Sequence, residues 1–136
     1  MSKIFPTQMD IFIVADSVRQ ESGGKVSLLG VFAGGRIVIG SNQRLPAPIP
    51  LAFYCLFSSG EGEFAAKAKI HTPSKGEIGP FDLPGVTKIP NQSITMLLNF
   101  PIIVLPDLGK YVLEIFLDDK SYKDEFSLEQ TDHSVT

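Results

Sequence analysis

The densest group of side chains that could do chemistry in this sequence is acidic. Asp118 and Asp119 stand together, and Asp124 and Glu125 follow a few residues later. Carboxylate oxygens are the ligands that Ca²⁺ takes in proteins, so one interpretation is a calcium site in a loop. Consecutive residues of a strand point to opposite faces, however, so Asp124 and Glu125 do not converge with the other two on one ion. We therefore interpret the group as a charged hairpin turn and assign no metal-binding residue.

Nucleophilic catalysis needs a serine or cysteine beside a histidine that a third group orients. The single cysteine, Cys55, lies in the apolar run 51–57, which predicts a buried and unreactive thiol. His71 falls on a lysine-bearing strand face and His133 in the polar tail, so both are expected to face solvent. The chain has no Gly-x-Ser-x-Gly motif and no tryptophan for sugar stacking. We assign no catalytic residue and expect a protein that is not an enzyme.

Two glycine pairs, Gly23-Gly24 and Gly34-Gly35, resemble phosphate-binding loops only superficially. Neither pair is followed by a helical pattern whose N-terminus would hold an anion. Hairpin and bulge positions explain both pairs, since glycine tolerates the backbone angles found there. We assign no cofactor-binding residue and expect no cofactor.

Length and composition place limits on the class of protein. The 136 residues are predicted to form a single β-sandwich domain over 1–136, with 130–136 as a flexible tail. The net charge is −3 and the 12 Lys and Arg residues are scattered, which argues against a nucleic-acid partner. No stretch approaches the roughly 18 apolar residues of a membrane span. One cysteine and an N-terminus without an apolar signal segment lead us to expect a cytoplasmic protein.

Short segments rich in β-branched and aromatic residues, cut by ten prolines and twelve glycines, predict an all-β fold. Segment 51–57 is apolar on both faces, as expected of a central strand. Pro101 predicts a bulge or an edge position within 93–104. The Pro-rich segments 41–50 and 73–90 are expected to be irregular, the second with at most a short edge strand. The strands are expected over 10–17, 25–33 with a bulged continuation at 36–39, 51–57, 63–72, 93–104, and a final hairpin that turns at 118–121.

Alternation along these strands predicts the core. Phe12, Val14, Val112 and Phe116 lie opposite the main apolar stripe of their strands, so either those faces are assigned wrongly or the four residues form an exposed interface patch. The mean hydropathy of +0.15 is high for a small domain and keeps the second interpretation open. The predicted core consists of Leu28, Phe32, Phe53, Cys55, Phe64, Ile70, Leu98, Tyr111, Leu113, Ile115 and Phe126.

The run Asp107-Leu108-Gly109-Lys110-Tyr111, directly before an alternating strand, resembles the tyrosine corner of immunoglobulin-like sandwiches. The resemblance implies that the Tyr111 hydroxyl bonds to backbone near Asp107, a contribution of about 1 kcal/mol. Leu113 stands where antibody domains place their second cysteine, and the chain has no tryptophan, so an antibody-type domain is not expected. The predicted fold is an immunoglobulin-like Greek-key β-sandwich of two antiparallel sheets, with about seven to nine strands.

Two segments also resemble a family of small, mostly bacterial β-sandwich domains of unknown function. The first combines an aspartate after an apolar strand, a Gly-Lys turn and a Leu-x-Gly-x-Phe strand, at Val14–Asp16, Gly24–Lys25 and Leu28–Phe32. The second combines Gly109–Tyr111 with Asp118–Asp119 ahead of a final amphipathic strand. The resemblance covers most of the chain and implies a fold, but it brings no functional residue with it.

These observations favour a non-catalytic protein-binding or assembly module. Its partner would be a protein of unknown identity or further copies of the chain, contacted through strand edges and the Pro-rich segments 41–50 and 73–90. The alternative is a β-sandwich that binds lipid in a calcium-dependent manner, or a small molecule, at one end. A hydrolase with an unconventional site is the weakest of the three hypotheses.

Overall fold

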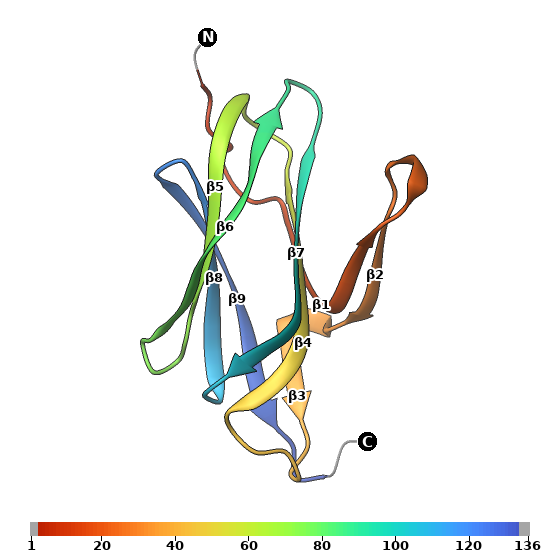
Figure 1. Cartoon of the computed structure of the whole chain (residues 1–136), viewed down its shortest axis with the longest axis vertical. Coiled ribbons are helices and arrows are strands. Elements are labelled where there is room, and N and C mark those ends of the chain that lie inside the picture. Colours follow the sequence, from red (N-terminus) through yellow and green to blue (C-terminus); the bar gives the residue numbers. More distant parts are fainter. Residues whose placement is uncertain (1–2, 134–136) are drawn as a thin grey trace.

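The computed structural model describes residues 3–133, which form two β-sheets packed face to face (Figure 1). One sheet has four strands in the order β2-β1-β4-β7 and the other has five in the order β3-β9-β8-β5-β6. The predicted all-β sandwich is confirmed. The strands are β1 (Ile11–Gln20), β2 (Val26–Val31), β3 (Arg36–Ile39), β4 (Ala47–Phe57), β5 (Gly62–His71), β6 (Glu77–Lys88), β7 (Ile94–Leu105), β8 (Gly109–Leu117) and β9 (Lys120–Gln130).

The four-residue strand β3 corrects one expectation. It does not continue β2 but joins the opposite sheet, where it pairs with the end of β9 in parallel. The expectation of two wholly antiparallel sheets is therefore wrong at this pair. A short 3₁₀ turn, η2 (Ala33–Gly35), carries the chain across, with Gly34 at a φ of +66°. The crossing lets Ile37 and Ile39 enter the core, where they are 2% and 3% exposed.

Strand alternation is confirmed in β5 and in the β8–β9 hairpin. Phe64, Ala66, Ala68 and Ile70 are buried on one face of β5. The hairpin buries Tyr111, Leu113, Ile115 and Leu117 from β8 and Tyr122, Phe126 and Leu128 from β9. Its turn is tighter than predicted, because Leu117 pairs directly with Lys120 and leaves only Asp118 and Asp119 between the strands.

Most of the predicted core is buried, but Leu28 and Phe32 are only half-buried. Beyond Ala15, β1 leaves β4 and forms a hairpin with β2 that projects from the sandwich (Figure 1). Because β2 is the outermost strand of its sheet, Leu28 has a strand neighbour on one side only. In the first half of β1, the face that points to the core is the one that carries Phe12 and Val14, so the predicted inward face is wrong there. Val14 is 2% exposed and Phe12 stacks on Phe53, whereas Ile11 is 41% exposed.

Both Pro-rich segments are more regular than expected. Segment 73–90 contains the 12-residue edge strand β6, and segment 41–50 ends within β4. Pro80 and Pro84 lie at the two register shifts between β5 and β6, where the missing N–H costs no ladder hydrogen bond. In β7, the residues around Pro101 oppose Pro50 at a further register shift. The predicted bulge at Pro101 is thus confirmed, and β7 is also an edge strand.

The Tyr111 side chain closes the turn between β7 and β8. Its hydroxyl donates to the Asp107 carbonyl at 2.6 Å and accepts from the Asp107 N–H at 3.0 Å. The N–H and the carbonyl of Asp107 are thus both satisfied by one buried side chain, and burial raises the pKa of Tyr111. The predicted hydroxyl contact is confirmed.

Residues 130–133 are tied to the β3–β4 loop. The Gln130 side chain donates to the carbonyls of Gly40 and Gln43, and the His133 carbonyl accepts from the Ser41 N–H. Residues 130–133 of the predicted tail are therefore held by hydrogen bonds, and 134–136 lie outside the described residues.

Candidate functional site

The structure separates the acidic residues of the last hairpin. One Asp118 oxygen accepts from the Ala65 N–H at 2.9 Å and the other pairs with the Lys3 ammonium at 2.6 Å, which together hold the pKa of Asp118 below its usual value. Asp124 instead accepts from the N–H of Glu125, and Glu125 pairs with Lys110 at 3.7 Å. Within residues 3–133, no three His, Cys, Asp or Glu side chains gather as a metal site.

Cys55 lies on the core face of β4 and is 0% exposed. Burial, together with the negative charge of Asp124, raises the pKa of its thiol to about 12. Because the thiolate is the reactive form, this cysteine is a poor nucleophile. The predicted burial of the thiol is confirmed, and His133 is solvent-exposed as expected.

His71 does not simply face solvent, which corrects the sequence interpretation. Its Nε2 lies 2.6 Å from Oε1 of Glu114, on the outer face of the five-stranded sheet. Lys123 approaches the same carboxylate from β9 at 3.9 Å, and Glu114 is only 8% exposed. Cross-strand register creates this cluster, since Glu114 of β8 stands opposite both Lys69 of β5 and Lys123 of β9. Sequence spacing alone carries no signal for it.

Burial and the neighbouring groups shift the pKa of Glu114 in opposite directions. Burial raises its pKa, but hydrogen bonds from His71 and Ser121 and the charges of Lys123 and His71 outweigh burial and leave the pKa below its usual value. Among the hydrogen bonds of the described residues, the His71 ring contacts Glu114 and no hydroxyl or thiol. The pair thus lacks a nucleophile and serves to fasten β5, β8 and β9 together.

We expect acid to remove the stabilisation that Glu114 provides. A carboxylate whose pKa is lowered by folding stabilises the protein above its unfolded-state pKa, near 4.5, and loses that contribution as the pH falls through the folded-state value. Glu114→Gln should therefore destabilise the protein at pH 7, with the difference from wild type shrinking below about pH 4. Urea denaturation at both pH values measures this. Glu63→Gln, at an exposed position of β5, is the control, and a difference that is constant with pH would contradict the assignment.

An apolar groove lies where the outermost strands of the two sheets meet. β6 and β7 are the outermost strands of their sheets and lie on the same side of the sandwich (Figure 1). Phe81 of β6 and Phe100 of β7 meet across the gap with ring centroids 4.9 Å apart. Next to this contact is an open groove of about 320 Å³, lined mainly by Leu83, Pro84 and Val86 of β6 and by Thr95–Leu98 of β7. We call this region the seam.

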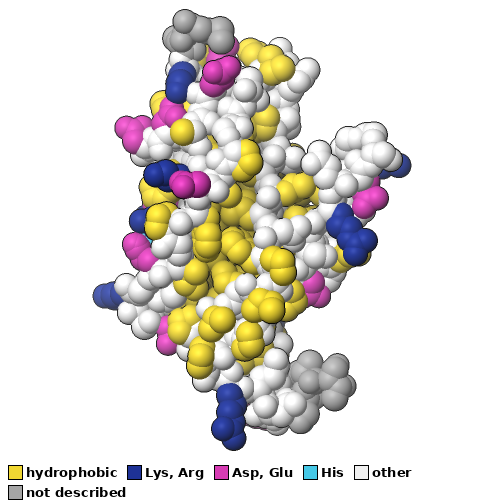
Figure 2. Space-filling view, viewed as in Figure 1, with side chains coloured by type: hydrophobic (Ala, Val, Ile, Leu, Met, Phe, Trp, Pro, Cys, Tyr) yellow, Lys and Arg dark blue, Asp and Glu magenta, His cyan; other side chains and the backbone are white. Residues whose placement is uncertain are grey.

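Apolar exposure continues from the seam along the end of β7. Ile102 is 72% exposed and Val104 is 50% exposed. Val104 stands opposite Pro48 of the neighbouring strand β4, and both are exposed. The seam, Ile102, Val104 and Pro48 together are the β7 surface. Figure 2 shows hydrophobic side chains running down the middle of this side of the molecule, with charged side chains at its margins. The two Pro-rich segments flank β7, one through β4 and the other through β6.

The backbone edges of this side are poorly suited to accept another strand. β6 is interrupted by register shifts at Pro80 and Pro84, and β7 by the shift near Pro101. Prolines and bulges on edge strands prevent continuous pairing with a further strand. The β7 surface therefore offers side chains rather than backbone groups for contact.

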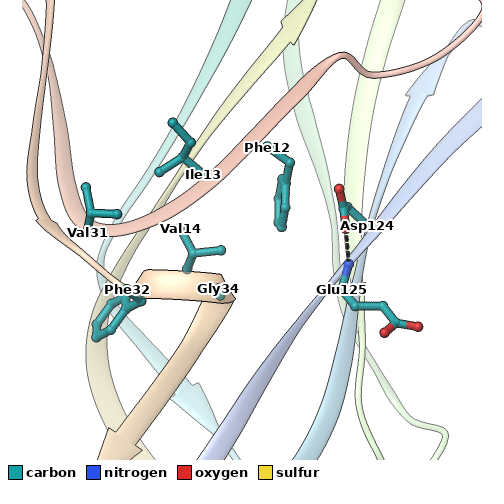
Figure 3. Close-up of a pocket in the computed structure, with 9 residues that line it drawn as sticks. Phe12, Ile13, Val14, Val31, Phe32, Gly34, Asp124 and Glu125 are labelled. Carbon is teal, nitrogen blue, oxygen red and sulfur yellow. Dashed lines mark hydrogen bonds between the residues drawn. The ribbon is translucent and has the colours of Figure 1, made fainter.

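A second groove, of about 310 Å³, opens on the opposite side of the sandwich, between β1 and β9 (Figure 3). Phe12 and Val14 of β1 and Phe32 form apolar walls, and Asp124 borders the groove from β9. In Figure 3 the side chains of Phe12 and Asp124 lie beside the same opening, whereas that of Glu125 points away. The sequence identified Asp124 as part of a turn cluster and gave no sign of this groove, because strands distant in sequence form it.

Comparison with known proteins identifies the family to which this chain belongs. Residues 10–126 match the family of unknown function DUF6941. The chain belongs to this family. The matched region begins just before β1 and ends inside β9, so it includes the seam, the Tyr111 turn and the groove between β1 and β9. No curated protein matches the chain. Across the described residues, no helix has the length and apolarity needed to cross a bilayer.

Proposed function

We propose that this member of DUF6941 is a non-catalytic protein-binding or assembly module that makes its contact through the β7 surface. The observation that carries the proposal is the exposure of Ile102 and Val104, at 72% and 50%, beside a groove with apolar walls. Contiguous exposed apolar side chains on a soluble domain mark interaction surfaces. The expectation from sequence that segments 41–50 and 73–90 are contact surfaces is kept, with β7 between them as its centre.

The shape of the surface favours a macromolecular partner over a small ligand. The groove is open, and the apolar region extends along β7 and onto Pro48 of β4. Small-molecule sites bury most of their ligand in a concave pocket, whereas protein interfaces are broad with an apolar centre and a polar rim. The charged side chains at the margins in Figure 2 fit such a rim.

The test replaces the exposed apolar side chains without touching the core. In the double variant Ile102→Lys/Val104→Lys we expect self-association, measured by light scattering after size exclusion, or co-purification of partners to fall at least tenfold. The matched control is Val38→Lys, at a 43% exposed valine on the edge strand β3 of the other sheet. A wild type that stays monomeric at high concentration and captures the same proteins as the double variant would overturn the proposal.

The strand arrangement supports a related proposal about topology. The Tyr111 turn, the β8–β9 hairpin and a short strand that crosses sheets to pair in parallel with the last strand are together compatible with an immunoglobulin-like Greek key. We also keep a bacterial, cytoplasmic and non-enzymatic protein as part of the proposal. The resemblance to mostly bacterial domains supports the first expectation, the single cysteine supports the second, and the burial of that thiol supports the third.

A further inference from the structure

The last strand has a backbone edge that the fold leaves bare. β8 pairs with β9 from Lys120 to Leu128, but on the other side β3 pairs only with Ser127–Gln130. Along Lys120–Phe126, the described residues supply no strand on that side. The N–H of Glu125 is satisfied by the neighbouring Asp124 side chain at 2.8 Å instead of by a strand. Backbone groups along an edge that has no neighbouring strand are the ones to which an added strand bonds.

The bare edge borders the groove between β1 and β9. The groove's apolar walls come from Phe12, Val14 and Phe32, and Val14 is 2% exposed. Two contacts of β9 lie on either side of Asp124. On one side the Tyr122 hydroxyl donates to the Pro6 carbonyl, and on the other Gly35 lies against the Glu125 carbonyl. The stretch of β9 from Tyr122 to Phe126 is about 13 Å long, so roughly four residues of an extended segment can lie along it while the ends of that segment extend beyond.

Asp124 gives the groove its charge. It belongs to the inward stripe of β9, between the buried Tyr122 and Phe126, where the alternation calls for an apolar residue. Its carboxylate has no ion pair with any cation of the described chain, and its one hydrogen bond there is the short-range contact to Glu125. An inward charge can also simply guard an edge against strand addition. The apolar groove beside it, with a volume of about 310 Å³, favours a binding role.

We propose that this groove binds an extended, basic peptide segment of a partner protein. The segment adds along the bare edge of β9, places an apolar side chain against Phe12 and Val14, and places a Lys or Arg two residues away against Asp124. Residues two apart in an extended chain point to the same side, so both side chains enter the groove together. The site is separate from the β7 surface, and each proposal is tested by its own variants.

The test uses the full chain and two blocked, fluorescent hexapeptides that differ at one position. The first is carboxyfluoresceinyl-Thr-Leu-Thr-Lys-Thr-Val-amide and the second carries Glu in place of Lys. Fluorescence polarisation should show binding of the Lys peptide that weakens with added salt, and binding of the Glu peptide at least tenfold weaker. In amide spectra of labelled protein, the Lys peptide should shift residues 12–14 and 121–126.

Asp124→Asn is the decisive variant, because asparagine keeps an oxygen for the Glu125 N–H and preserves the fold. It should weaken binding of the Lys peptide by about three- to fivefold, as expected for a partly exposed charge pair. Asp119→Asn, in the turn, should leave binding unchanged. Failure to bind the Lys peptide at millimolar concentration, equal binding of the two peptides, unchanged binding by Asp124→Asn, or spectral shifts elsewhere would each overturn the proposal.

Discussion

Replacing Phe53 with alanine is expected to lower the free energy of unfolding by about 3–5 kcal/mol. Phe53 is 0% exposed and lies in β4, between β1 and β7. Its ring is 5.8 Å from that of Phe12, 6.2 Å from that of Phe100 and 5.3 Å from that of Phe126. These partners come from three other strands and both sheets, so no single neighbour can move in to fill the cavity.

Urea denaturation followed by circular dichroism measures the effect. For a domain whose total stability is on the order of 5–15 kcal/mol, Phe53→Ala can prevent folding altogether, so Phe53→Leu supplies a milder second variant that should lose a smaller amount. Phe116→Ala, at a half-buried position on the outer face of β8, is the matched control. Equal losses at positions 53 and 116 would show that Phe53 is not the centre of the core.

Gly60→Ala is expected to have the second-largest effect. Gly60 has a φ of +93°, and a Cβ there would lie 2.7 Å from the Ile4 carbonyl oxygen and 2.7 Å from the Pro6 nitrogen. Both contacts are with backbone, so the segment that pairs Ile4 with Glu61 must move. The backbone conformation alone costs about 1–3 kcal/mol for a non-glycine residue, and loss of the Ile4–Glu61 hydrogen bonds adds to it.

Gly34→Ala isolates the steric part of this effect. Gly34 also has a positive φ, of +66°, but an added Cβ would meet no atom within 4 Å. Gly60→Ala should therefore be the more destabilising of the two in thermal unfolding, and it alone should accelerate hydrogen exchange at the amides of Ile4 and Glu61. If the two variants lose equal stability, the contact with residues 4–6 is not rigid.

Local pattern was sufficient for the features that depend on neighbouring residues. Alternation with a period of two predicted the inward faces of β5, β8 and β9, and the doubly apolar run around Phe53 and Cys55 predicted a central strand. The turn ending at Tyr111 predicted its own hydrogen bonds, since donor and acceptor are four residues apart. The contact role of the Pro-rich segments stays a prediction, and local pattern did not indicate the exposure of Ile102 and Val104 on β7.

Features that depend on which strands pair, and in which register, were decided by the tertiary structure alone. The sequence around Ile37 is equally compatible with extending β2 or joining β9, and only packing against the second sheet selects the latter. Cross-strand register placed His71 beside Glu114, and the late start of β3, whose first residue pairs with Ser127, left β9 bare beside Asp124. Side-chain direction along a strand is set by local backbone geometry, whereas strand partners are set by burial of whole faces against distant segments. For this reason the sequence determined the sandwich and its core stripes, and only the folded chain determined its open edges and grooves.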